Sequence, residues 1–228
     1  MSQRNEGSTG HAGRVVRTLL DRYGRTYGEQ IGIDIAAGGK SAVFLWLCAT
    51  VLLSYRVRAD VAVCAARALL KQDWTTPERL IAAPPEECIR TLNNAGYARY
   101  DETASHTLTD LSSMLIGRYA GDLGNLRKHA NSNPSEERRL LQELKGVGAV
   151  GVDVFFREAQ SAWDELYPYA DKRALLAAKK LGLGSTAAHL AGFVEKRDFP
   201  RLAAALVRTD LESDYEAVRQ TAEQLAHA

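Results

Sequence analysis

The chain has 228 residues, of which 46% are hydrophobic and 25% charged, and its formal net charge is +1. This composition is typical of a globular protein and excludes extensive disorder and fibrous repeats. The longest apolar run, residues 42–53, is shorter than the roughly 20 residues that span a bilayer, so it predicts a buried helix and no membrane partner. The first residues lack an apolar signal core and the three cysteines form no C-x-x-C pair, so we expect a cytoplasmic protein.

Apolar residues recur at helical spacing through the first half of the chain. The glycine-rich residues 24–39 interrupt this spacing and predict a loop or a short extended piece. Thr76-Pro77 and Pro84-Pro85 are helix start signals, because a capping side chain and a proline both favour the first turn. We expect helices over residues 13–23, 41–55 and 57–72, one beginning at 77, one from 85 to Gly96, and one over 105–119.

The second half is predicted to be helical as well. Asn133-Pro134-Ser135-Glu136 is typical of a capping box that opens a helix, which we expect to end at Gly146. Gly148 or Ala149 begins the next helix, so a tight Gly146-Val147-Gly148 hairpin joins the two. Further helices are expected over residues 172–182, 185–196, 198–208 and 213–226. The sequence therefore predicts an all-α chain with about ten helices.

Basic residues gather in two places although the total charge is near zero. Both clusters suit a polyanionic partner, and both are also what solvated helix faces contain. The first cluster is Arg56, Arg58, Arg67 and Lys71, and the second is Lys172, Arg173, Lys179 and Lys180.

Residues 146–151, GVGAVG, satisfy the G-x-G-x-x-G pattern of dinucleotide-binding loops. That pattern requires a strand before it, whereas residues 136–145 carry charges at helical spacing and no alternating strands and helices surround them. We therefore reject a dinucleotide-binding loop. A glycine hairpin between two helices instead presents backbone N–H groups at a helix N-terminus, where they can bind a phosphate without any side chain.

Three segments resemble one known family. Residues 140–156, LLQELKGVGAVGVDVFF, resemble the hairpin of the helix-hairpin-helix DNA glycosylase superfamily, with Lys145 where a proline is usual. Residues 168–183, PYADKRALLAAKKLGL, resemble the family's loop that carries the essential aspartate. Residues 51–56, VLLSYR, resemble its helix end next to the base that is flipped out. Together, residues 42–183 resemble the endonuclease III branch in their order of helices.

The resemblance implies an all-α fold of two helical lobes with DNA in the cleft between them. Residues 39–160 would form a helical barrel domain that carries the helix-hairpin-helix, and residues 1–38 and 161–228 a second lobe formed by both termini. The implied activity is base-excision repair by a monomeric DNA glycosylase. Such an enzyme flips a damaged or mismatched base out of double-stranded DNA and hydrolyses its N-glycosidic bond. In a bacterium it would be associated with the nucleoid.

The resemblance also assigns roles to individual residues. Asp171 is the expected catalytic residue, whose carboxylate stabilises positive charge on the deoxyribose and orients or deprotonates water. The alternative for Asp171 is a plain N-cap, which alone would suffice for an aspartate before a helix. Arg56 is expected to fill the gap left by the flipped base. The expected phosphate contacts are the backbone N–H groups of Gly146, Val147 and Gly148, with or without a monovalent cation, together with Lys145, Lys172 and Arg173.

Several positions depart from the family pattern. Val150 stands where lyase members carry a lysine, so we expect a monofunctional hydrolase unless Lys145 or Lys172 supplies the amine. No cysteine follows Cys88, so neither an iron–sulfur cluster nor another cofactor is expected, and five scattered histidines give no metal-ligand spacing. Residues 151–153 also differ from the family's usual continuation. Two other classes therefore stay open: a non-catalytic DNA-binding protein of the same fold, and a helical scaffold that binds protein.

Overall fold

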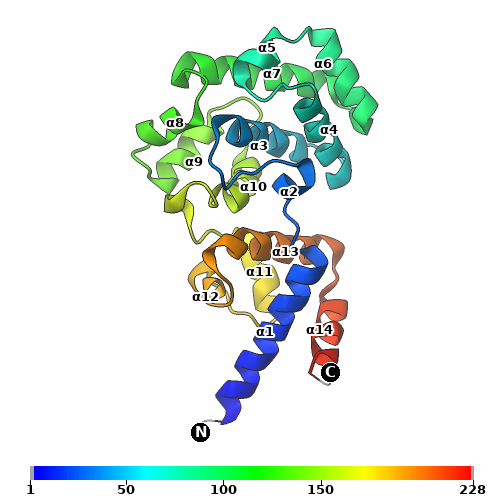
Figure 1. Ribbon diagram of the computed structural model, residues 1–228, viewed down its shortest axis with the longest axis vertical. Coiled ribbons are helices and arrows are strands. Elements are labelled where there is room, and N and C mark those ends of the chain that lie inside the picture. The colour runs from blue at the N-terminus through cyan, green and yellow to red at the C-terminus, as the bar shows by residue number, and fades with distance from the viewer. Residues whose placement is uncertain (1–2, 227–228) are drawn as a thin grey trace. The chain divides into compact units, whose positions relative to one another are not determined.

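The computed structural model describes residues 3–226, with side chains from residue 10 onward. Within this range the regular elements are all helical and there is no strand, which confirms the predicted all-α fold class. The chain divides into two compact units (Figure 1), which we call the central unit, Tyr27–Leu166, and the terminal unit, Met1–Thr26 with Tyr167–Ala228. The sequence places these boundaries after residues 38 and 160, whereas the structure places them after residues 26 and 166.

The central unit is built around one buried helix. Its elements are α2 (Tyr27–Ile31), α3 (Lys40–Leu53), α4 (Ala59–Lys71), α5 (Pro77–Ala82), α6 (Pro85–Leu92), the π-turn η1 (Asn93–Tyr97), α7 (Asp101–Tyr119), α8 (Leu123–His129), α9 (Pro134–Gln142), α10 (Ala149–Ala159) and η2 (Asp164–Leu166). Helix α3 is apolar on every face, and residues 43–52 are all buried. It contacts α4, α7, α8 and α10, and the Trp46 indole N–H donates to Phe155 O of α10 at 3.0 Å. The most apolar run of the sequence is thus the core of this unit.

The terminal unit joins the two ends of the chain. Its elements are α1 (Gln3–Tyr23), α11 (Lys172–Lys180), α12 (Ala187–Ala191), η3 (Lys196–Asp198), α13 (Phe199–Glu212) and α14 (Tyr215–Gln224). Helix α1 packs against α13 and α14, and α11 packs against α13 (Figure 1). Arg22 of α1 pairs with Asp214 at 2.6 Å, which ties the first helix to the start of the last. None of the helices in residues 3–226 combines the length and apolarity that a membrane crossing needs.

Two predicted helix starts are confirmed by their caps. The Thr76 hydroxyl accepts a hydrogen bond from Arg79 N at 3.3 Å, and Asn133 Oδ1 accepts from Ser135 N and Glu136 N at 3.0 and 3.2 Å. The predicted helix ends are less accurate. Helix α9 ends at Gln142 rather than Gly146, and α6 ends at Leu92, where the π-turn takes over.

Residues 24–39, predicted as a loop or a short extended piece, contain the short helix α2. Its first turn is capped from a distant part of the chain, because Glu158 of α10 accepts hydrogen bonds from Tyr27 N at 2.9 Å and Gly28 N at 2.8 Å. A Cβ on Gly28 would lie 2.9 Å from Glu158 Oε2, so glycine allows this close approach. This cap also explains why α2 belongs to the central unit rather than to the terminal one.

Glu137 of α9 is a buried carboxyl group. It is 0% exposed, and neither of its oxygens has a hydrogen-bond partner among the described residues that would stabilise a charge. Burial and the neighbouring Glu165 carboxylate raise the pKa of Glu137 from its ordinary 4.5 to about 8. Burial alone would raise the pKa of Glu165 as well, but two hydrogen bonds from Arg127, at 2.7 and 2.6 Å, lower it. Glu137 therefore keeps its proton at neutral pH, next to an ionised Glu165.

This proton makes stability depend on pH. The unfolded chain releases it near pH 4.5 and the folded chain only near pH 8. Stability therefore falls as pH rises between these values, by at most about 1.4 kcal/mol per pH unit. Residue 137 no longer titrates in Glu137→Gln. The free energy of unfolding, measured with urea at a series of pH values in this range, should therefore fall less steeply with pH than in the parent chain. Glu136→Gln removes a carboxyl group whose pKa is lowered beside Arg139 and should keep the slope. The same slope in Glu137→Gln as in the parent chain would contradict the buried proton.

Candidate nucleic-acid interface

The connection between α9 and α10 lies tightly against the core of the central unit. Gly146 has a φ of +80°, a conformation that side chains disfavour. A Cβ at Gly146 would overlap the Thr107 methyl group of α7 and lie 3.2 Å from Val51 Cγ1 of α3. Val147 is buried and donates its N–H to Leu144 O at 3.1 Å. The predicted hairpin is therefore present, and its sharp turn requires glycine at position 146.

Gly148 is glycine for a different reason. Its φ of −87° and ψ of −179° are open to any residue, and a Cβ there would meet nothing within 4 Å. It is the N-cap of α10 and provides no side-chain cap, so the N–H groups of the first turn have no side-chain acceptor. Five other helices in the described chain have a capping side chain, from Thr76, Asp122, Asn133, Asp171 and Thr186. Helices α3, α4, α6, α7, α13 and α14 start without a side-chain cap, as α10 does. Position 148 thus leaves the N-terminus of α10 open to solvent.

The hairpin adjoins the carboxyl end of α3, where Arg56 follows. Gly151 of α10 packs against this end, since a Cβ on it would lie 3.3 Å from Ser54 Oγ. Arg56 is exposed two residues later. The structure therefore brings the hairpin and the segment of Arg56 to the same part of the central unit.

Three aromatic and polar contacts hold the end of α3 in place. Tyr97 OH donates to Leu52 O at 2.6 Å, Tyr55 OH lies 3.1 Å from Thr107 Oγ1, and the Tyr55 and Tyr97 rings meet edge to face. Burial raises the pKa of Tyr97 well above its ordinary range, so its hydroxyl stays a donor. The sequence alone assigns Tyr97 no role, because its hydrogen-bond acceptor, Leu52 O, lies 45 residues away in the chain.

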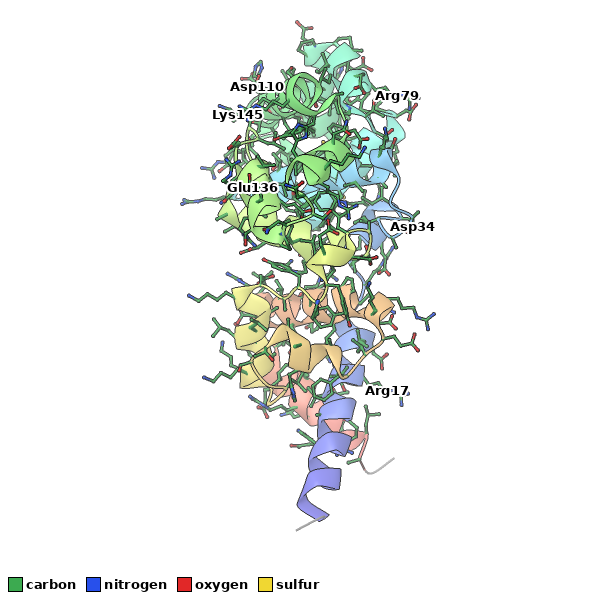
Figure 2. All side chains as sticks on the ribbon, turned by 90° about the vertical axis from the view of Figure 1, so that its left-hand side faces the viewer. Arg17, Asp34, Arg79, Asp110, Glu136 and Lys145 are labelled. Carbon is green, nitrogen blue, oxygen red and sulfur yellow. The ribbon has the colours of Figure 1, made fainter. Side chains whose placement is uncertain are left out.

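The remaining groups of the hairpin lie at the surface. Lys145 is exposed, on the outside of the central unit in Figure 2. Val150 is 69% exposed, in the first turn of α10. Asp153 pairs with Arg138 of α9 at 2.7 Å, so it links the two helices of the motif. The unusual residue at position 153 thus has a structural explanation.

Asp171, in the terminal unit, is the N-cap of α11. Its Oδ1 accepts hydrogen bonds from Arg173 N at 2.9 Å and Ala174 N at 3.2 Å, which confirms the capping role. Lys172 is exposed, whereas the Arg173 guanidinium lies 3.7 Å from Asp210. Asp210 also pairs with Lys180, so this acid compensates part of the basic cluster of α11.

No group of three or more histidine, cysteine, aspartate or glutamate side chains in the described residues could hold a metal ion. Cys48 and Cys88 are buried, and burial raises the pKa of both thiols.

Comparison with known proteins gives limited information. No family model matches the chain, and no curated protein matches it. Solved structures that are similar include a trapped endonuclease III–DNA covalent intermediate in its estranged-adenine complex and a non-covalent endonuclease III–DNA complex. Each is 19% identical to this chain, with a TM-score of 0.45, and each match covers 72% of this chain and 71% of the endonuclease III chain. A similarity of this size leaves the site to be judged from the chain's own residues.

The two hairpin glycines should respond differently to alanine. Gly146→Ala introduces a Cβ at positive φ into an occupied space, so it should lower the free energy of unfolding by at least about 1 kcal/mol. Gly148→Ala meets open space and should change it by less than about 0.5 kcal/mol. Urea unfolding of the two variants measures both values, and equal losses would contradict the geometry of the hairpin.

Proposed function

We propose that the chain is a DNA glycosylase of base-excision repair, which hydrolyses the N-glycosidic bond of a flipped damaged or mismatched base. The observation that carries the proposal is the open N-terminus of α10. Gly148 has no steric reason within the chain to be glycine, and no side chain caps the helix behind it. A missing Cβ at this place allows a phosphate oxygen to approach the first-turn N–H groups, where the helix dipole also favours an anion.

The hairpin would bind the DNA backbone and not the bases. The N–H groups of Gly146 and Gly148 are assigned to one phosphate, with or without a monovalent cation. The Val147 N–H, which was expected to join them, is donated to Leu144 O at 3.1 Å instead. Lys145 is exposed beside them and can contact a neighbouring phosphate. Contacts of this kind fix the register of a protein on the duplex and carry no sequence information.

Arg56 is assigned the space of the extruded base. It is exposed and follows the end of α3, which Tyr55 and Tyr97 hold against the rest of the unit. A long cationic side chain on a rigidly held segment suits insertion into a duplex. Unstacking a nucleobase costs a few kcal/mol, and the contacts of the inserted side chain must offset this cost.

Asp171 is assigned the chemistry. Loss of the base develops positive charge on the deoxyribose, and a fixed carboxylate stabilises this charge and orients the attacking water. The hydrogen bonds from Arg173 N and Ala174 N would hold the carboxylate in one orientation, so capping and catalysis are compatible. Lys172 and Arg173, the first two residues of α11, are assigned to DNA phosphates near the start of this helix.

The product is proposed to be an intact strand with an abasic site. Val150 is exposed where a lyase would need an amine, and a valine side chain cannot form a Schiff base with the sugar. Lys145 and Lys172 are the two lysines whose participation would change this assignment.

Asp171→Asn separates catalysis from capping, because asparagine is as good an N-cap as aspartate but carries no charge. On a panel of duplexes that each contain one lesion or mismatch, the parent chain should produce alkali-labile abasic sites on at least one duplex. Asp171→Asn should lower that rate by at least about 100-fold with an unchanged melting temperature.

The matched control is Asp122→Asn, which changes the N-cap aspartate of α8 in the same way and should keep the activity. Equal rates for Asp171→Asn and the parent would rule out the catalytic assignment. Strand breaks before alkali, together with a covalent adduct trapped by borohydride, would show that a lysine takes part and that the product assignment is wrong.

Arg56→Ala tests the inserted side chain. Because the side chain is needed only when a base is flipped, the variant should lose at least about 10-fold in base release while its affinity for undamaged DNA falls less. Single-turnover assays and DNA titrations measure the two quantities. Losses of equal size would instead make Arg56 a simple phosphate contact.

A second candidate is a DNA-binding protein without catalysis. It is favoured by the N-cap hydrogen bonds of Asp171, which explain this aspartate without any reaction. Salt-dependent DNA binding by the parent chain, with no base released from any duplex of the panel, would identify this candidate.

A further inference from the structure

A polar cavity lies in the central unit between α4 and the segment formed by α6 and η1. Its volume is about 440 Å³, within the range of small-molecule sites. One wall is a face of α4 that carries Cys64, Arg67 and Lys71, and the other carries Thr91 and Asn94. The proposed glycosylase function uses none of these five residues.

The charge of this cavity is one-sided. Arg67 and Lys71 are one helical turn apart on α4, and no acidic residue lines the cavity. Like charges at this spacing repel each other and destabilise a helix. Neither cation is compensated by a carboxylate of the described chain, although most arginines there are, for example Arg58, Arg79, Arg118, Arg127, Arg138 and Arg139. An anion in the cavity would supply the missing charge.

The rest of the lining suits a ligand larger than a single ion. One guanidinium nitrogen of Arg67 donates to Gln30 O, which fixes the head group and leaves its other donors available. The Gln72 and Asn94 amides and the Thr91 hydroxyl add donors and acceptors around the cavity, and the walls between them are alanines. Two cations at one place and neutral hydrogen-bonding groups elsewhere match a molecule with one charged end and one polar, uncharged end.

We propose that this cavity binds a small phosphorylated molecule of about the size of a mononucleotide, with its phosphate held by Arg67 and Lys71. The cavity is open to solvent on one side, so a small ligand can enter it and bring its phosphate to Arg67 and Lys71. The site is separate from the hairpin, so its occupancy does not depend on glycosylase activity.

Cys64 allows occupancy to be measured on the unmodified chain. It lines the cavity and is exposed, whereas Cys48 and Cys88 are buried, so a thiol-reactive reagent under native conditions reports on Cys64. Adenosine monophosphate and ribose 5-phosphate are the probes, and adenosine is the control without phosphate. At least one of the two phosphorylated probes should slow labelling at least about 5-fold at saturation, and adenosine should not.

Lys71→Gln should weaken this protection at least about 10-fold in apparent affinity, because it removes one of two cations from the phosphate. Lys179→Gln makes the same change of charge on the terminal unit and should leave the protection unchanged. No protection by either phosphorylated probe, or equal protection by adenosine, would overturn the proposal. Protection by duplex DNA alone would overturn it too, by making the cavity part of a DNA-binding surface.

Discussion

Gly146 brings the connection between α9 and α10 into contact with α3 and α7, and the candidate interface depends on this approach. A side chain at position 146 would overlap Thr107, so the turn closes only with glycine. Once it has closed, Val147 is buried while Gly148 and Val150 are exposed. One steric constraint thus decides which groups of the hairpin belong to the core and which can reach a ligand.

Local signals in the sequence predict much of this arrangement. The caps at Thr76, Asn133 and Asp171 act within three residues, so they can be read from a short window. The glycines of the hairpin are visible in such a window too, but the contact of Gly146 with Thr107 is not. The helix α2 cannot be read in this way, because its cap is a carboxylate 130 residues away. The same holds for the contacts of Tyr55 and Tyr97 at the end of α3 and for the proximity of Glu137 to Glu165. These features depend on tertiary contacts, which periodicity does not contain.

Charge compensation explains why a near-neutral chain can still have anion sites. Many of its basic side chains pair with carboxylates, including Arg173 and Lys180, which share Asp210. Lys145 and Lys71 have no such partner among the described residues, and each lies at a feature that suits a phosphate: the open start of α10 and the cavity beside α4. The total charge of a chain therefore says less about anion binding than the position of its uncompensated cations.

The most direct test of the central claim is the DNA affinity of Gly148→Val as a function of salt. The backbone of residue 148 is extended and a Cβ there meets nothing within 4 Å, so the fold should be unchanged. The methyl groups of valine would keep a phosphate away from the N–H groups. Gly117→Val, at another position with open space in the same unit, is the matched control. If the hairpin binds DNA, Gly148→Val should bind a duplex at least about 10-fold more weakly, with a nearly unchanged salt slope because no cation is removed, and Gly117→Val should not. An affinity of Gly148→Val equal to that of the parent chain at every salt concentration would contradict the assignment of the hairpin to DNA.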